Sequence, residues 1–446
     1  MRILKICGWK RPPFKTGQKP PRPRFEGGNP LSCIKITPHP LRGAVRPPAS
    51  KSDGHRAVIC AALAEGESRV SGLTMSEDIE ATLRCLSAMG AQIRRTSGGV
   101  RIVGGRFSPT AALDCGESGS TLRFLLPVAA AAGIAAELTG RGRLPDRPVE
   151  VLTALLRAHG VDCAADALPL HIRGRLTPGR FVLPGNVSSQ YITGLLLALP
   201  LLGEESEILL TSRLESAGYV DMTLRSMAAF GIEVVRTPDG YRIPGGQRYR
   251  PAAYTVEGDW SSAAFPAAAG ALGGDLQILG LSSDSLQGDR KIVEILRRFG
   301  AAVSMEGDCL RVRQSALRPV EVDAAQIPDM IPAVCAIAAA AKGTTRIRSA
   351  GRLRLKESDR LSAIARALGG MGVAVEEEAD ALTIHGGRVH GGRVDGVGDH
   401  RIVMAFAVLA AYAEGETVIT DCEAVAKSYP AFFDDFQALG GICHVL

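Results

Sequence analysis

The sequence predicts an α/β protein of two similar domains, each with three repeats of strand, helix, strand, helix and two strands. Two observations support this fold class. Six segments of similar pattern follow one another at nearly constant spacing along the 446 residues. Each segment contains one helix pattern that is apolar nearly all round and one that is amphipathic. A helix without a polar face must be buried, so in each domain three sheets should surround three parallel helices, as an inside-out α/β barrel, with a cleft between the domains.

Glycines mark the repeat. Gly90, Gly160, Gly231, Gly300, Gly372 and Gly441 are spaced 70, 71, 69, 72 and 69 residues apart. Each follows an amphipathic pattern, such as Ile79, Leu83, Leu86 and Met89 in the first copy. Glycine after such a pattern predicts the end of a helix. Strand-like stretches follow each glycine, and turn sequences at 96–99 and 238–240 predict hairpins.

Composition and charge exclude several classes of protein. The chain is 46% hydrophobic and 22% charged, as expected of a folded globular protein. Its longest uncharged apolar runs, 330–341 and 402–413, are shorter than the roughly 20 residues of a membrane span. Residues 1–30 hold eight Lys or Arg and one acid, whereas residues 31–446 hold 44 bases and 45 acids. The near-neutral body argues against general nucleic-acid binding.

Residues 1–30 are predicted to be a flexible, basic, Pro-rich tail. They contain six Pro but neither the apolar stretch of a secretory signal nor the serines of a transit peptide. An unstructured extension is the simpler interpretation, and contact with nucleic acid or membrane is the alternative.

Neither a metal nor a cofactor is expected. The ten cysteines are scattered without a Cys-x-x-Cys pair, and the eight histidines lack metal-ligand spacing. No glycine-rich phosphate or dinucleotide motif is present. Reduced thiols indicate a cytoplasmic protein.

The starts of the buried helices carry the candidate chemistry. Ser, Thr and Asp there could be ordinary caps. Capping does not explain a cation at a helix amino end, where the dipole is already positive, but a bound anion does. Several such starts together predict a polyanionic ligand in the cleft. The residues are Lys51-Ser52 with Arg56, Ser120-Thr121 with Arg123, Ser188-Ser189-Gln190, Ser261-Ser262 and His400-Arg401.

Loop residues extend this set, and each has a simpler interpretation. Lys356 with Asp359 and Glu357 with Arg360 could be surface ion pairs at i, i+3 spacing. Asp329 after Pro328 could be a helix cap, and Lys427 could be solvated. Arg147 lies in the loop sequence Leu-Pro-Asp-Arg-Pro.

From about residue 33 onward, the sequence resembles the 5-enolpyruvylshikimate-3-phosphate synthase family. The resemblance rests on an ordered set of strings: Pro48-Ala49-Ser50-Lys51-Ser52, Gly119-Ser120-Thr121-Leu122-Arg123, Arg147-Pro148, Val187-Ser188-Ser189-Gln190-Tyr191, Tyr219-Val220-Asp221-Met222-Thr223-Leu224, Glu257-Gly258-Asp259, Lys356-Glu357-Ser358-Asp359-Arg360, Asp399-His400-Arg401 and Ala426-Lys427-Ser428-Tyr429-Pro430. It implies a first domain at 50–257 and a second made of 31–49 with 258–446. It also implies enolpyruvyl transfer from phosphoenolpyruvate to the 5-hydroxyl of shikimate 3-phosphate by a cytoplasmic monomer.

The resemblance also implies residue roles. The shikimate 3-phosphate contacts would be Lys51, Ser52, Arg56, Ser188, Ser189, Gln190, Ser216, Asp329 and Lys356. The phosphoenolpyruvate contacts would be Lys51, Gly119, Arg147, Gln190, Arg360, Arg401 and Lys427. Asp329, Glu357 and Lys51 would be catalytic.

The sequence departs from the family pattern at two positions near the expected site. The same activity is still expected, but these positions do not allow the substrate affinity to be predicted. Glu117 stands where many members have Asn, and Arg352 stands where Asn is common. Two alternatives are considered. UDP-N-acetylglucosamine enolpyruvyltransferases typically have Lys-Asn at the first helix start and a Cys before Arg-Pro, whereas this chain has Lys51-Ser52 and no Cys at 140–146. The other alternative is a non-catalytic repeat scaffold that binds polyanions.

Overall fold

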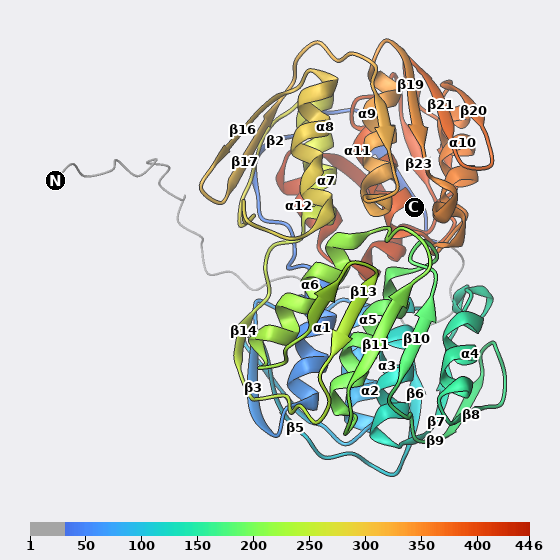
Figure 1. Ribbon diagram of the computed structural model, residues 1–446. Coiled ribbons are helices and arrows are strands. Elements are labelled where there is room, and N and C mark those ends of the chain that lie inside the picture. The colour runs from blue at the N-terminus through green and yellow to red at the C-terminus, as the bar shows by residue number, and fades with distance from the viewer. Residues whose placement is uncertain (1–31) are drawn as a thin grey trace. The chain divides into compact units, whose positions relative to one another are not determined.

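The computed structural model describes residues 32–446, which form one compact unit. The tail predicted at 1–30 lies outside the described residues. Within the described part, two hydrophobic cores organise the chain, one built from residues 57–256 and the other from 34–45 with 260–443. We call the parts around them the first and second lobes. Figure 1 shows the first lobe below, in blue to green, and the second above, mainly in yellow to red.

The described residues form six four-stranded sheets with one common topology. In each sheet the pair of strands at one edge is parallel and the other two pairs are antiparallel, for example β6 with β7 parallel, then β7 with β9 and β9 with β8 antiparallel. This matches the predicted repeat of strand, helix, strand, helix and two strands, so the α/β fold class is confirmed.

The first lobe holds three of the sheets. Their orders are β14-β3-β5-β4, β6-β7-β9-β8 and β10-β11-β13-β12. The strands are β3 (Gly66–Ser71), β4 (Gln92–Thr96), β5 (Gly99–Gly104), β6 (Thr110–Asp114), β7 (Ala135–Thr139), β8 (Val161–Cys163), β9 (Leu170–Gly174), β10 (Arg180–Leu183), β11 (Ser206–Leu210), β12 (Val235–Thr237), β13 (Gly240–Ile243) and β14 (Ala253–Thr255). The hairpins predicted at 96–99 and 238–240 join β4 to β5 and β12 to β13.

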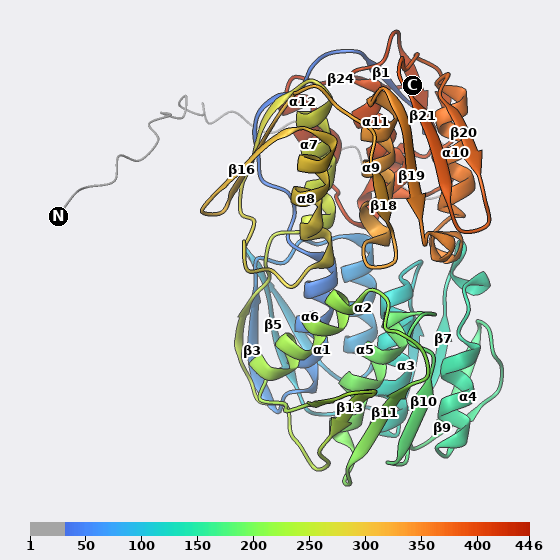
Figure 2. The ribbon, with the colours of Figure 1, turned by 45° about the horizontal axis from the view of Figure 1, so that its top comes forward.

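The second lobe holds the other three sheets, in the orders β16-β17-β15-β2, β18-β19-β21-β20 and β22-β23-β1-β24. The strands are β1 (Ile34–Thr37), β2 (Arg42–Val45), β15 (Asp275–Ile278), β16 (Ala302–Glu306), β17 (Cys309–Arg313), β18 (Glu321–Asp323), β19 (Gly343–Arg348), β20 (Ala374–Glu377), β21 (Leu382–Gly386), β22 (Arg393–Val394), β23 (Thr417–Ile419) and β24 (Ile442–Val445). Strands β1 and β2 precede the first lobe in sequence but pair in the second, as the blue strands of the upper lobe show in Figures 1 and 2.

One buried helix and one amphipathic helix accompany each sheet. The buried helices are α1 (Lys51–Leu63), α3 (Gly119–Ala132) and α5 (Ser189–Ala198) in the first lobe, and α7 (Trp260–Leu272), α9 (Ile331–Ala340) and α11 (His400–Ala410) in the second. The amphipathic helices are α2 (Glu77–Ala88), α4 (Glu150–Ala158), α6 (Ala217–Ala229), α8 (Ile292–Phe299), α10 (Arg360–Gly370) and α12 (Phe432–Ala438). The predicted alternation of buried and amphipathic helices is confirmed.

Two local details differ from the prediction. The fifth buried helix begins at Ile331, after a 3-10 turn, η4 (Pro328–Met330), and not directly after Asp329 as the interpretation of that residue as a helix cap requires. Pro332 has no N–H to donate to the Pro328 carbonyl, so the preceding turn cannot be α-helical. In the sixth repeat, Gly440 rather than Gly441 adopts the left-handed backbone, with φ of 93°. The other five marker glycines all have positive φ.

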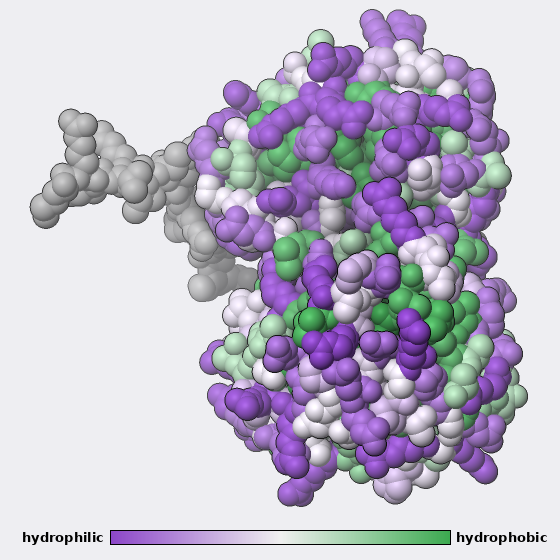
Figure 3. Space-filling view, in the orientation of Figure 1, coloured by the Kyte–Doolittle hydropathy of each residue, from purple (hydrophilic) through white to green (hydrophobic). Residues whose placement is uncertain are grey.

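No helix within residues 32–446 is long and apolar enough to cross a membrane. The face shown in Figure 3 is mainly hydrophilic on both lobes, with smaller hydrophobic areas towards the middle of the molecule. Large exposed apolar side chains, such as Phe107, Val182 and Leu355, are spread over different elements.

Candidate active site

A cavity between the two lobes collects most of the predicted site residues. Residues at the amino ends of α1, α3, α5 and α11 line it, together with loop residues of both lobes. The predicted residues that line it are Lys51, Ser52, Arg56, Gly119, Arg147, Ser188, Ser189, Gln190, Ser216, Asp329, Lys356, Glu357 and Arg401. Of the predicted set, Arg360 and Lys427 are not among the lining residues. The start of α7, Ser261-Ser262, does not line the cavity either.

Other residues cap these helices, which leaves the predicted site residues at the helix starts available to the cavity. Each cap is the residue directly before its helix, and its side chain accepts a hydrogen bond from a backbone N–H of the first turn. These caps are Ser50 for α1, Ser118 for α3, Ser188 for α5, Asp259 for α7 and Asp399 for α11. Lys51, Ser52 and Arg401 are therefore not needed as caps. The partial positive charge of each helix start adds to these cations.

Asp329 is the centre of a charged cluster. Its carboxylate lies 3.2 Å from Lys356 Nζ, 3.0 Å from an Arg360 nitrogen and 3.4 Å from an Arg401 nitrogen. No side-chain capping bond forms at η4, so the simpler interpretation of Asp329 as a cap is wrong. Burial by itself raises the pKa of Asp329, but Arg401, Lys356 and Arg360 hold it well below 3.8. Asp329 is therefore ionised at neutral pH.

Arg360 is fully buried behind this cluster. It begins α10 and pairs with Asp399 through two nitrogens, with Glu357 at 2.7 Å and with Asp329. The Glu357–Arg360 pair predicted from spacing exists, but Arg360 is fully buried and Glu357 is partly buried, so the pair is not on an open helix surface. Lys356 pairs with Asp329 instead of Asp359. Burial opposes ionisation of Glu357, yet Arg360 and Arg147 hold its pKa well below 4.5.

The first lobe contributes cations whose partners are mostly neutral. Arg56 donates to Thr223 Oγ1 and to the Tyr219 carbonyl, and Arg123 donates to Gln190 and to the Pro148 carbonyl. Burial lowers the pKa of each guanidinium to about 10, so both stay charged at neutral pH. The Nε atom of Arg147 is buried and has no hydrogen-bond partner. This excess of cations favours anions in the cavity.

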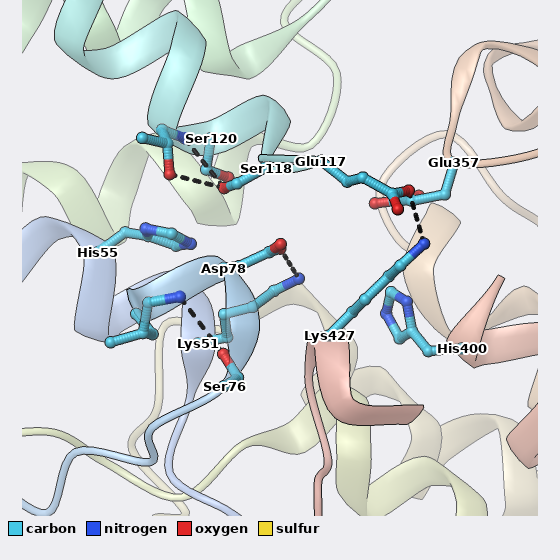
Figure 4. Close-up of polar contacts among 12 residues, drawn as sticks. Lys51, His55, Ser76, Asp78, Glu117, Ser118, Ser120, Glu357, His400 and Lys427 are labelled. Carbon is cyan, nitrogen blue, oxygen red and sulfur yellow. Dashed lines mark hydrogen bonds and ion pairs between the residues drawn. The ribbon is translucent and has the colours of Figure 1, made fainter. Parts of the chain in front are cut away.

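Two predicted site lysines, Lys51 in the cavity lining and Lys427 outside it, pair with acids. Lys51 Nζ lies 2.6 Å from Asp78 Oδ2, and Lys427 Nζ lies 2.7 Å from Glu117 Oε2. Figure 4 shows the second pair near Glu357, with His400 beside the lysine. Burial and the neighbouring Lys51 and Arg401 lower the pKa of His400 to about 3, so this imidazole is neutral.

Sequence reasoning missed Asp78, which lines the cavity from the first turn of α2. An acid there is typical of any helix start, so no local signal distinguishes it. Tyr219 and Arg352 also line the cavity. Within residues 32–446 no group of three or more His, Cys, Asp or Glu side chains is arranged to hold a metal ion.

Comparison with known proteins identifies the family. The family model described as EPSP synthase (3-phosphoshikimate 1-carboxyvinyltransferase) matches residues 36–436. The 3-phosphoshikimate 1-carboxyvinyltransferase of Clostridioides difficile is 41% identical over 431 residues, which cover 92% of this chain and 98% of that protein. The same enzyme of Clostridium kluyveri is 42% identical over 421 residues, again covering 92% of this chain and 98% of that protein.

Solved structures agree with the sequence comparisons. EPSP synthase from Acinetobacter baumannii superposes with a TM-score of 0.80 at 28% identity, covering 93% of this chain and all of that one. The enolpyruvyl transferase NikO from Streptomyces tendae has a TM-score of 0.77 at 20% identity, covers 93% of this chain and 99% of its own, and shows a shared fold. The chain belongs to the EPSP synthase (3-phosphoshikimate 1-carboxyvinyltransferase) family.

Proposed function

We propose that this chain transfers the enolpyruvyl group of phosphoenolpyruvate to the 5-hydroxyl of shikimate 3-phosphate and releases phosphate, the penultimate step towards chorismate and the aromatic amino acids. Family membership supports the reaction. The observation that carries it at the site is the buried Nε of Arg147, which has no protein partner. A buried donor without a partner costs free energy, and an anionic substrate group would supply that partner.

The two substrates divide the cavity between them in this proposal. All the residues expected to contact shikimate 3-phosphate line the cavity, as do Lys51, Gly119, Arg147, Gln190 and Arg401 of the phosphoenolpyruvate set. Arg360 lies behind Asp329 and Glu357, bound to carboxylates. It therefore orients these two acids, and a direct contact with phosphoenolpyruvate would require it to exchange a partner.

The mechanism is an addition followed by an elimination. The 5-hydroxyl loses its proton towards Asp329 or Lys356 as its oxygen attacks the central carbon of phosphoenolpyruvate, and Glu357 delivers a proton to the methylene carbon. The resulting tetrahedral intermediate then expels phosphate while the new methyl group returns a proton and restores the double bond. Positioned proton transfers of this kind contribute roughly 10²–10⁴-fold.

Glu357 must be protonated before it can donate a proton in this mechanism. Arg360 and Arg147 outweigh burial and hold its pKa well below 4.5, so it has no proton to donate until these cations are neutralised. Phosphoenolpyruvate brings a phosphate and a carboxylate to the same cations. Neutralising them raises the pKa of Glu357, since burial then dominates. Substrate binding thereby prepares the acid.

We infer two domains, at 50–257 and at 31–49 with 258–446, and a monomer that acts in the cytoplasm. The separate cores of the two lobes support the domain division. Free thiols at buried positions such as Cys60, Cys335 and Cys422 support a reducing compartment.

Phosphate release from purified protein tests the function. We expect turnover with phosphoenolpyruvate and shikimate 3-phosphate but none with UDP-N-acetylglucosamine as acceptor. The Asp329→Asn variant should lose roughly 10²–10⁴-fold in kcat while still binding both substrates in calorimetry. Turnover only with the nucleotide sugar, or a fully active variant, would refute the assignment. Removing residues 1–30 should leave the rate unchanged, whereas a polyanion scaffold acting through that tail would lose its binding.

A further inference from the structure

Lys427, like Arg360, is a predicted cavity cation that does not line the cavity. Its Nζ is bound to Glu117 Oε2 at 2.7 Å and to the Gly398 carbonyl at 2.9 Å. An ammonium group has three donors, so two are already used by the protein. By contrast, Lys51, Arg147 and Arg401 all line the cavity. Glu117 therefore holds Lys427 at the rim.

Glu117 is itself held in a defined place. It directly precedes Ser118, the cap of α3, so its negative charge lies next to a positive helix end. Its carboxyl group packs against Gly142, where an added Cβ would approach its carboxyl carbon to 2.6 Å. The loop that contains Gly142 continues to Arg147. The carboxylate thus lies beside this loop and beside Lys427, outside the lining of the cavity.

The pair joins the two lobes and is only partly screened by water. Glu117 precedes a first-lobe helix, and Lys427 ends a 3-10 segment of the second lobe, η6 (Cys422–Lys427). The Lys427 side chain is 11% exposed and that of Glu117 is 31% exposed. Burial disfavours the charge on Lys427, but Glu117 outweighs it and raises the pKa of the ammonium above 10.5. Lys427 is therefore charged at neutral pH.

We propose that Glu117 is an internal counter-ion of Lys427 that competes with the anionic donor substrate for the ammonium group. This inference rests on the proposed function, because it takes phosphoenolpyruvate as the competing anion. When the substrate arrives, the ammonium exchanges the carboxylate of Glu117 for a phosphate or carboxylate of the ligand. An ion pair that exists only in the free enzyme lowers the substrate's affinity by its own free energy. Glu117 thus tunes affinity for the donor without contributing to turnover.

The Glu117→Gln variant tests this competition. Partly exposed ion pairs contribute about 1 kcal/mol, so the KM for phosphoenolpyruvate should fall about fivefold. The kcat and the KM for shikimate 3-phosphate should stay unchanged, which a merely structural defect would not produce. Glu205→Gln is the matched control, because Glu205 forms an exposed ion pair with Arg242 of β13 and neither residue lines the cavity. The kcat and both KM values of this control variant should equal those of the wild type.

A double variant separates competition for Lys427 from general charge repulsion. In a Lys427→Met background, Glu117→Gln should give a clearly smaller gain in phosphoenolpyruvate affinity. An equal gain there, or an unchanged or raised KM in the single variant, would overturn the proposal. Wild-type turnover is the reference: an inactive wild type refutes the proposed function, whereas an active wild type with an unresponsive Glu117→Gln variant refutes only this inference. Calorimetric titration with phosphoenolpyruvate alone gives the same comparison without turnover.

Discussion

The hydroxyl of Tyr219 donates a hydrogen bond to Asp329 across the boundary between the lobes, at 2.9 Å. Lys356, Arg360 and Arg401, which pair with the same carboxylate, all belong to the second lobe. Tyr219 belongs to α6 of the first lobe. The proposed catalytic carboxylate is thus tied to both halves of the cavity.

Tyr219→Phe should lower kcat about 10- to 150-fold, because a hydrogen bond to a charged group contributes roughly 1.5–3 kcal/mol. The ring remains, so packing in α6 is kept and the thermal midpoint should change little. Steady-state phosphate release and a melting curve measure the two effects. Wild-type kcat in a folded variant would show that the bond to Asp329 has no part in turnover.

Gly119→Ala should weaken phosphoenolpyruvate binding. An added Cβ would lie 2.5 Å from an Arg147 nitrogen and 2.7 Å from an Arg123 nitrogen, so the Arg147 guanidinium must move. Displacing one charge-assisted contact should raise the KM for phosphoenolpyruvate by about an order of magnitude. The KM for shikimate 3-phosphate is the internal control, and an equal rise in both constants would indicate general damage to the site instead.

Asp289 should make stability fall as pH rises. Burial and the neighbouring Asp329 raise its pKa to about 7, against 3.8 for an ordinary Asp, so the folded chain binds the proton more tightly than the unfolded one. A raised folded pKa gives stability that is present below pH 3.8 and is lost as pH rises through about 7. Asp289→Asn should flatten the decline in thermal midpoint between pH 5 and 8. The exposed Asp162→Asn variant should follow the wild type, and parallel curves for all three proteins would contradict the role of Asp289.

The sequence predicts the helix starts well because the signals are local. The apolar runs after Lys51, Gly119 and Ser188 specify buried helices, and parallel buried helices bring their amino ends to one end of a lobe. The repeat period then predicts the same arrangement in the second lobe. Residue types at those positions therefore predict an anion site before any contact is known.

Other features depend on tertiary contacts that no local pattern specifies. Arg360 directly follows Asp359, the cap of α10, and nothing in the local sequence distinguishes it from an ordinary first-turn residue. Only the tertiary fold brings Asp399 and Asp329 into contact with it. The start of α7 has two serines, as the start of α5 does. However, Asp259 caps α7 and the Ser261 hydroxyl donates to Asp289, so these serines already have partners and do not line the cavity. Glu117 and Lys427 are 310 residues apart in sequence and meet only between the lobes.

The crossing of α3 and α5 should be sensitive to a single methyl group. At Gly194 of α5 an added Cβ would lie 2.2 Å from the Arg123 carbonyl oxygen and 2.9 Å from Pro127, so Gly194→Ala must push the two helices apart. Overpacking of this kind costs typically about 1–3 kcal/mol, and the movement also shifts Arg123 and Gln190 at the cavity. We expect a lower midpoint in chemical unfolding together with weaker substrate binding. Gly203→Ala is the matched control, because nothing lies within 4 Å of its added Cβ, and its stability should be equal or slightly higher. Equal stability of both variants would show that the helices can separate at no cost.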